Sequence, residues 1–216
     1  MNPRDRYDVS HLPEARFEPG SRGRVLQNRL GVKRRREMDE IEAREQLRAL
    51  QKFVAVYDRE HRFTAADIRD LHQEWLGRIY DWAGRYRQVN ISKGNFAFAM
   101  ARQVPSLMEN FEKEVLQEFT PCLFATQEEV VHALAVVHTE LILIHPFREG
   151  NGRVARMLAV LMGLQAGYPA LDFSQIKGKI KQGYIAAVQM GMKRDYAAME
   201  DIFRMVLRRT LRQQQK

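Results

Sequence analysis

The sequence predicts an all-α protein, a helical bundle that carries one small β-hairpin. Most of the chain consists of long segments with apolar residues at helical spacing, several of them bounded by capping residues, glycine or proline. Only residues 86–99 contain convincing β-prone pieces, and these flank Lys93, Gly94 and Asn95. With 216 residues and 45% hydrophobic content, the chain can build one sizeable core. A two-stranded hairpin is marginal alone, so we expect it to lean on the helices.

The leading part of the chain, residues 1–36, is expected to be irregular because three prolines and three glycines interrupt it. A helix is expected over about residues 37–58, and its candidate core positions are Met38, Ile41, Leu47, Leu50, Val54 and Tyr57. The basic block 33–36 precedes acidic residues, which favours a solvated charge cluster over a nucleic-acid contact. A second helix is expected from Thr64, as its N-cap, to about Tyr80.

Five further helices are expected after the hairpin. Thr126 and Glu129 have the spacing of a capping box, and the helix that they begin is apolar on nearly every side up to Ile144. The other four are expected at about residues 104–119 with Pro105 in the first turn, from 154 to near Gly167, over 174–190, and from 196. The chain thus divides into an irregular segment 1–36, a helical domain 37–205 and a basic, polar tail 206–216.

Composition argues against several classes of protein. Cys122 is the only cysteine, so no internal disulfide forms, and the six scattered histidines make no metal-ligand cluster. No apolar run has the length and flanks of a membrane span, and the N-terminus lacks a signal-peptide core. We therefore expect a cytoplasmic protein without membrane contact. The net charge of +8 admits nucleic-acid binding, but the basic residues are spread along the chain, so a nucleic-acid partner is not expected.

The twelve residues HPFREGNGRVAR, 145–156, carry the chemistry of the chain. They lie between two apolar helices, so they form a loop that leads into a helix N-terminus. Such an N-terminus offers unpaired N–H groups and a partial positive charge to anions. Gly150 and Gly152 let the backbone approach phosphate oxygens closely. Arg153 and Arg156 add the charge and the fork geometry that suit phosphate.

The other side chains of this loop complete a candidate catalytic site. Glu149 is its only carboxylate, and Mg²⁺ in proteins is commonly held by one carboxylate together with substrate phosphates. His145 has an ordinary pKa near neutrality, which makes it a candidate general base. Phe147 is expected to anchor the loop in the core. Taken singly, each of these residues is more often structural or solvated, but their joint spacing favours catalysis.

The spacing His-x-Phe-x-Glu-Gly-Asn-Gly-Arg-x-x-Arg resembles the signature of the Fic family of protein adenylyltransferases, and the similarity covers roughly residues 37–205. The resemblance implies a Fic-like fold, ATP as co-substrate and Mg²⁺ as cofactor. It implies that His145 deprotonates a Ser, Thr or Tyr hydroxyl of a target protein, which then attacks the α-phosphate of ATP. AMP is transferred and pyrophosphate leaves. The resemblance assigns Mg²⁺ to Glu149 and the anion hole to Gly150, Asn151, Gly152 and Arg153.

The hairpin segment Ile91, Ser92, Lys93 and Gly94 resembles the flap of Fic proteins, and residues 82–86 before it also look like the family. In that family the flap lies over the active site and pairs with an extended segment of the target. This is β-strand addition, in which backbone bonds set the register and pockets select side chains. We therefore expect these four residues near the site.

Many Fic proteins are held inactive by a helix with the pattern Ser/Thr-x-x-x-Glu-Gly/Asn, whose glutamate pairs with the second arginine of the motif, here Arg156. Only Ser10 and Glu14 have this spacing, but Ala15 follows them and Pro13 would strain a helix interior. An internal inhibitory helix is therefore not expected. The resemblance points instead to a toxin whose inhibitory helix comes from a separate small antitoxin protein, or to an enzyme without such inhibition.

Several alternatives remain open at this point. Doc-type kinases carry a lysine where this chain has Gly152, which argues against phosphoryl transfer here. Phosphocholine transfer is possible, although no residue selects it. The loop could also belong to a catalytically idle nucleotide-binding or partner-binding module. Delivery of the protein into another cell as an effector is not excluded by the sequence.

Overall fold

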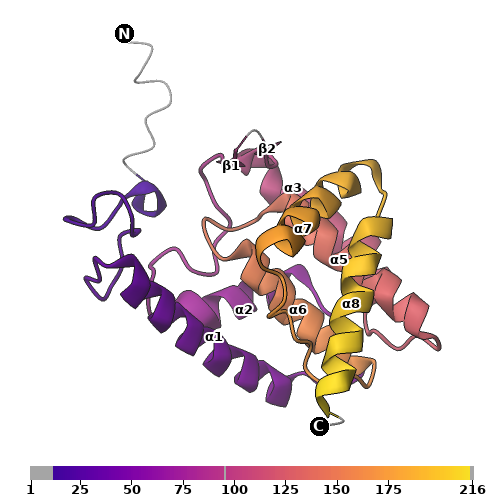
Figure 1. Cartoon of the computed structure of the whole chain (residues 1–216). Helices are drawn as coiled ribbons and strands as arrows, with labels where there is room; N and C mark the ends of the chain where they lie inside the picture. The colour runs from indigo at the N-terminus through magenta and orange to yellow at the C-terminus, as the bar shows by residue number, and fades with distance from the viewer. Residues whose placement is uncertain (1–11, 95, 215–216) are drawn as a thin grey trace.

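One buried helix, α5 (Gln127–Ile144), lies at the centre of the fold (Figure 1). The computed structural model describes residues 12–94 and 96–214. In it α5 packs against α6 (Asn151–Gln165) and α8 (Ala197–Gln214), and 12 of its 18 residues are buried. Its capping box is confirmed, since the Glu129 N–H donates to Thr126 Oγ1 at 3.2 Å and the Thr126 N–H donates to Glu129 Oε2 at 2.9 Å. The all-α prediction with a small hairpin is confirmed.

The helices α1 (Arg35–Val56) and α2 (Ala65–Leu76) pack on one another, and α2 also contacts α6. Thr64 is the N-cap of α2, as predicted. The core prediction for α1 is partly wrong, because Leu47 and Val54 are 58% and 46% exposed. The buried positions are Met38, Glu42, Ala49 and Phe53. Met38 is buried, and Ile41, Leu50 and Tyr57 pack against the core as predicted, but the buried stripe also passes through the charged Glu42, which apolar spacing does not reveal.

The basic block at the start of α1 lies on the surface. Arg35 pairs with Asp39 at 2.9 Å and Arg36 pairs with Glu40 at 3.1 Å, each one helical turn apart, and all four side chains are more than half exposed. Exposed pairs of this kind add little to stability. The geometry is that of a solvated charge cluster.

The hairpin consists of β1 (Ser92–Lys93) and β2 (Phe96–Ala97), which are antiparallel with Lys93 opposite Phe96. Gly94 has φ +59°, as the turn requires, whereas Asn95 lies outside the described residues. After the hairpin come the short helix η3 (Ala101–Gln103) and an unbroken helical stretch. This stretch comprises α3 (Val104–Phe111), the π-helical η4 (Glu112–Leu116) and α4 (Gln117–Phe119), with Pro105 in the first turn as predicted.

The C-terminal helices differ from the prediction at their bounds. The helix α7 (Gly178–Met190) begins after the expected Ser174, because the Ser174 N–H donates to Asp172 Oδ1 at 2.8 Å and the chain makes a turn there. The short η5 (Gly191–Lys193) joins it to α8. The boundary expected at residue 205 falls inside α8, where Val206 and Leu207 are buried. Residues 206–214 therefore continue the helical body, and residues 215–216 lie outside the described chain.

The leading segment is irregular from residue 12 to residue 34, apart from a short turn of 3₁₀-helix, η2 (Pro13–Ala15), and a single β-bridge between Phe17 and Leu26. Residues 1–11, including Ser10, lie outside the described chain. Across residues 12–94 and 96–214, no helix is long and apolar enough to cross a membrane.

Candidate active site

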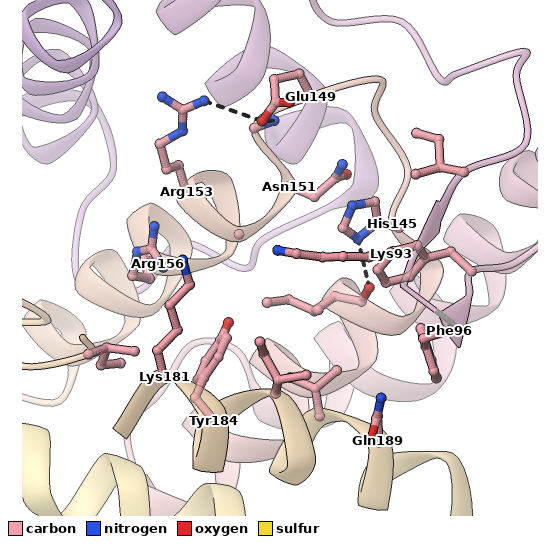
Figure 2. Close-up of a pocket in the computed structure, with 18 of the residues that line it drawn as sticks. Lys93, Phe96, His145, Glu149, Asn151, Arg153, Arg156, Lys181, Tyr184 and Gln189 are labelled. Carbon is pink, nitrogen blue, oxygen red and sulfur yellow. Dashed lines mark hydrogen bonds and ion pairs between the residues drawn. The ribbon is translucent and has the colours of Figure 1, made fainter. Parts of the chain in front are cut away.

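A cavity of about 950 Å³ opens where the hairpin, the loop between α5 and α6, and α7 meet (Figure 2). Every site residue predicted from the sequence lines it except Phe147. These residues are Ile91, Ser92, Lys93, Gly94, His145, Glu149, Gly150, Asn151, Gly152, Arg153 and Arg156. The structure thus brings together two segments that are about fifty residues apart in the sequence.

His145 is the residue at which α5 ends. It adopts the left-handed conformation, with φ +52° and ψ +60°, which histidine tolerates better than most residues, and Pro146 prevents the helix from continuing. The ring nitrogen Nδ1 lies 3.1 Å from the Ile142 carbonyl oxygen, which can only accept, so Nδ1 carries the hydrogen. In the neutral ring Nε2 then has a free lone pair, which is the atom that a general base uses.

The environment of His145 keeps its ring neutral. The ring stacks on Phe98 with 3.6 Å between the centroids. Burial, to which the positive charge of Arg87 adds, lowers the pKa of His145 to about 4, despite the bond to the Ile142 carbonyl. His145 is therefore unprotonated at neutral pH and able to accept a proton.

The loop after His145 is closed by one amide. Asn151 Oδ1 accepts from the Phe147 N–H at 2.8 Å, and Asn151 Nδ2 donates to the Phe147 carbonyl at 2.8 Å. The Phe147 side chain is fully buried, as predicted for an anchor. Because the amide of Asn151 is engaged at both ends, its remaining group for a phosphate is the backbone N–H.

His72 of α2 supports the same loop, although the sequence analysis did not single it out. Its ring stacks on Phe147 with 3.9 Å between the centroids. Its Nδ1 accepts from the Gly84 N–H at 2.8 Å, and its Nε2 donates to the Glu149 carbonyl at 3.1 Å. Burial lowers the pKa of His72 to about 3. A neutral histidine thus fixes the backbone next to Glu149.

The two glycines of the loop have different surroundings. Gly150 has φ +85°, and a Cβ atom added there would lie 2.6 Å from Trp75 Cζ3, so conformation and space both require glycine. A Cβ atom at Gly152 would meet nothing closer than Arg156 Nη1 at 3.9 Å. At the start of α6 the N–H groups of Asn151 and Gly152 find no acceptor within the described residues, which leaves them free for an anion.

Arg153 is already engaged within the protein. Its Nη1 donates to Glu42 Oε2 of α1 at 2.5 Å, and its guanidinium carbon lies 4.5 Å from the centre of the Trp75 ring. Its Nη2 lies 3.5 Å from Glu149 Oε1. This side chain is therefore fixed in orientation, and only part of its donor set faces the cavity.

Glu149 can hold a cation together with a bound phosphate. Its Oε1 accepts from the Gly150 N–H at 3.0 Å, while Oε2 has no protein partner among the described residues. No group of three or more metal-ligating side chains occurs in residues 12–94 and 96–214. One free carboxylate oxygen beside an anion site fits Mg²⁺, which keeps its waters and takes phosphate oxygens as ligands.

Arg156 differs from Arg153 in that no carboxylate pairs with it in the described part of the chain. Burial lowers the pKa of Arg156, and its guanidinium faces the cavity near Tyr184 (Figure 2). The Tyr184 hydroxyl is bonded to His138 Nε2 at 2.8 Å. A half-buried cation without a counter-charge favours an anionic ligand.

The contribution of α7 to the cavity was missed from the sequence. Lys181, Tyr184, Ile185 and Val188 line the cavity, and their spacing of i, i+3, i+4 and i+7 is the helical signal that could have found them. Lys177 lies just before this helix and also lines the cavity. With Lys93, Arg148, Arg153 and Arg156, six cationic residues face one carboxylate, Glu149, which suits a polyanion.

A buried arginine, Arg87, joins the hairpin to the catalytic loop. It is 2% exposed, and its guanidinium donates to carbonyls on both sides. The bonds reach the His145 oxygen at 2.7 Å, the Val89 oxygen at 2.8 Å and the Ala99 oxygen at 2.5 Å. Val89 and Ala99 lie on the two arms that lead into and out of the hairpin. Arg87 therefore sets the position of the hairpin relative to His145.

Glu14, the glutamate of the weak inhibitory pattern, is engaged elsewhere. Its Oε1 accepts from the N–H groups of Gln88 and Val89 at 2.6 and 3.0 Å, and its backbone oxygen accepts from Arg148 Nε at 2.9 Å. It lies in a 3₁₀ turn and supports the arm before the hairpin. Its carboxylate is not paired with Arg156.

Comparison with known proteins identifies relatives of the chain. Residues 62–162 match the family described as Fic/DOC. The chain is 34% identical over 110 residues to Protein adenylyltransferase Fic of Nematostella vectensis, covering 49% of this chain and 24% of that protein. It is 27% identical over 177 residues to Protein adenylyltransferase VbhT of Bartonella schoenbuchensis, covering 80% of this chain and 34% of that one. The chain thus spans about a quarter and a third of these two relatives.

The fold has counterparts among solved structures. The BepC protein of Bartonella tribocorum, solved with bound AMPPNP, superposes with a TM-score of 0.71 at 23% identity. The match covers 91% of this chain and 97% of that one, so the whole helical body and its hairpin form a known arrangement. Residues 62–162, which match the Fic/DOC family, contain the whole loop motif at 145–156 and the entire hairpin. Over residues 62–162 the chain is thus similar in sequence to the Fic/DOC family, it is related to protein adenylyltransferases, and it shares its fold with BepC.

Proposed function

We propose that this protein is an adenylyltransferase that transfers AMP from ATP to a Ser, Thr or Tyr hydroxyl of a target protein. One observation carries the proposal: a neutral His145 with a free Nε2 faces the same cavity as the N-terminus of α6, whose first N–H groups have no acceptor among the described residues. A base and an anion site side by side are what attack on a phosphate requires. The nucleotide-bound BepC structure supports ATP as the donor.

His145 accepts the proton of the target hydroxyl as its oxygen bonds to the α-phosphorus. The bond between the α-phosphorus and the bridging oxygen breaks, and pyrophosphate leaves with the electron pair. The N–H groups of Asn151 and Gly152, with Arg156, hold the phosphate oxygens. Glu149 would hold Mg²⁺, which neutralises phosphate charge when bound. Phosphate chemistry of this kind depends chiefly on positioning and charge.

The target is recognised at the hairpin. Ser92, Lys93 and Gly94 are exposed and line the cavity mouth, so an extended target segment added along this hairpin would present its hydroxyl to His145. Lys93 extends into the cavity in Figure 2, on the side of His145. Its charge favours a target segment with acidic residues near the accepting hydroxyl.

Regulation would come from outside this chain. Arg156 has no carboxylate partner among the described residues, and Glu14 is used to support the hairpin arm. We therefore place the protein in the toxin half of a pair whose small antitoxin supplies the inhibitory glutamate. The purified chain alone should then be active, and deleting its terminal segments should not activate it; activation by such a deletion would contradict the pairing.

The function is tested with purified protein, Mg²⁺ and a cell lysate, using ATP labelled at the α- or the γ-phosphate. Protein label from α-labelled ATP alone, absent with His145→Ala, is expected. Label from the γ-phosphate alone would mean kinase chemistry, which glycine at position 152 disfavours, since Doc-type kinases carry a lysine there. No label with intact ATP binding would favour an idle nucleotide-binding module.

A further inference from the structure

Glu42 is a buried carboxylate that reaches the active-site loop from a distant part of the chain. It is 2% exposed and lies on α1, 111 residues before its partner Arg153. Each of its oxygens is engaged: Oε2 by Arg153 Nη1 at 2.5 Å, Oε1 by the Tyr80 hydroxyl at 2.8 Å, and the backbone oxygen by Trp75 Nε1 at 2.8 Å. A buried charge is tolerated only with such complete pairing.

The Arg153 guanidinium is confined by three different groups. Glu42 lies at one end, the Trp75 ring lies 4.5 Å from its central carbon, and Glu149 Oε1 lies 3.5 Å from Nη2. A free arginine samples many rotamers and loses that freedom when it binds a ligand. In this protein the Arg153 side chain is already fixed in the folded state. Binding a ligand therefore costs little further side-chain entropy.

We propose that Glu42 is a positioning residue of the active site. It holds Arg153, and through Arg153 it orients Glu149, in the arrangement that receives the phosphates and cation of the nucleotide. The proposal rests on the proposed function only for the identity of the nucleotide. Glu42 touches neither the cavity nor the reacting atoms, and it acts through the ion pair alone.

Glu42 is distinct from an inhibitory glutamate in both partner and place. It pairs with the first arginine of the motif and approaches it from the core, whereas an inhibitory glutamate reaches the second, Arg156, through the nucleotide site. The residue four positions before it is Met38 rather than serine or threonine. Loss of an inhibitory glutamate raises activity, so the sign of the effect separates the two roles.

The test compares Glu42→Gln with the native chain in binding Mg²⁺ and AMPPNP, measured by calorimetry, and in thermal midpoint. We expect affinity to fall by about tenfold, because residues that orient a site usually contribute about this much. Glu40→Gln is the matched control, since it removes an exposed pair on the same helix. Tyr80→Phe is the second variant if Glu42→Gln does not fold. It should also lower the affinity for AMPPNP, but by less than tenfold.

A double-mutant cycle separates positioning from general stability. In an Arg153→Met background, Glu42→Gln should cause no further loss of AMPPNP affinity. An equal loss in both backgrounds, or a lower thermal midpoint with native affinity, would overturn the proposal. Tighter binding or increased protein labelling would make Glu42 inhibitory instead. A native chain that binds AMPPNP but labels no protein would refute adenylyl transfer and leave this comparison valid.

Discussion

At the scale of single residues, the site depends on side chains whose orientation and tautomer are fixed by hydrogen bonds to the backbone. The Nδ1 hydrogen of His145 is committed to the Ile142 carbonyl, and both nitrogens of His72 are committed to the backbone. Asn151 is committed to Phe147 in the same way. Among the described residues, the groups that remain available to a ligand include Nε2 of His145, Oε2 of Glu149, the first N–H groups of α6 and the guanidinium of Arg156.

The buried environment of His145 predicts an unusual pH dependence. Because its pKa is lowered to about 4, the ring stays neutral as the pH falls from 8 to about 5.5, where an ordinary histidine would be mostly protonated. We expect kcat/KM for the target to be nearly constant over this range. Loss of activity with an apparent pKa near 6.5 would contradict the tautomer and burial described for His145.

Gly150 and Gly152 predict opposite effects of the same substitution. Gly150→Ala should lower the free energy of unfolding by about 2–4 kcal/mol, because the left-handed backbone and the contact with Trp75 both oppose a Cβ atom. Gly152→Ala should leave stability unchanged or raise it slightly, because it adds a helix-favouring residue in open space. Its methyl group enters the cavity, so nucleotide affinity should fall. Urea unfolding and AMPPNP titration of both variants measure the difference.

At the scale of elements, the hairpin is held in place by Arg87 rather than by its own pairing. Its strands are only two residues long each, and an isolated hairpin of this size is not stable in water. The Arg87 guanidinium ties both arms to the end of α5, where carbonyl groups carry partial negative charge. The position of the hairpin edge relative to His145 thus depends on Arg87, together with the stacking of Phe98 on the His145 ring.

Arg87→Met should separate target recognition from nucleotide binding. Without the guanidinium the hairpin loses its register against His145, so kcat/KM for the target should fall by about a hundredfold, the effect of a misplacement of about 1 Å. AMPPNP affinity should change much less, since α6 and α7 are untouched. Arg85→Met, at an exposed position two residues earlier, is the control. Equal losses in both measurements would mean that Arg87 serves the fold alone.

At the scale of the whole molecule, the site draws on nearly the full length of the chain. Glu14 and Glu42 support it from the N-terminal part, and Tyr184 and Lys181 line it from the C-terminal part. The geometry of the loop at residues 145–156 is therefore determined largely by residues outside the loop. We therefore expect nucleotide binding and the folded structure to be lost in the same unfolding transition.

The buried His72 and His138 and the partly buried His145 predict how the whole molecule responds to acid. Burial lowers the pKa of His72 and His138 to about 3 and that of His145 to about 4. Below about pH 6.5 the unfolded chain binds protons that the folded chain refuses, so stability falls with pH by up to about 1.4 kcal/mol per unit for each histidine. Urea unfolding at pH 7 and 5.5 should reveal this loss.

One substitution tests this prediction directly. His138→Gln should make the dependence on pH shallower, because it removes one of the buried titrating groups. A free energy of unfolding that does not change between pH 7 and 5.5 would contradict the burial of these rings.

The sequence was sufficient for features that are local in the chain. The capping box at Thr126, the N-cap at Thr64, the closely spaced loop motif and the glycine turn of the hairpin are short patterns with direct structural causes. What it could not supply are partners brought together by tertiary packing. A glutamate in a helix is usually solvated, so nothing marked Glu42 as buried. Arg87, His72 and the lining face of α7 were missed for the same reason, and the exposure of Leu47 and Val54 could not be foreseen without the buried ion pair.

The closure of the loop by Asn151 also affects how the protein ages. An asparagine followed by glycine is chemically fragile, since the next backbone nitrogen can attack the side-chain amide and release ammonia. In this fold the Asn151 amide is buried at 3% exposure and bonded at both ends to Phe147, and Gly152 lies in a helix. Folding therefore protects the side-chain amide of Asn151 from this attack, whereas the amide is accessible in the unfolded chain. Durability of the loop in storage is therefore a property of the fold, and deamidation at Asn151 would serve as a chemical clock for unfolding.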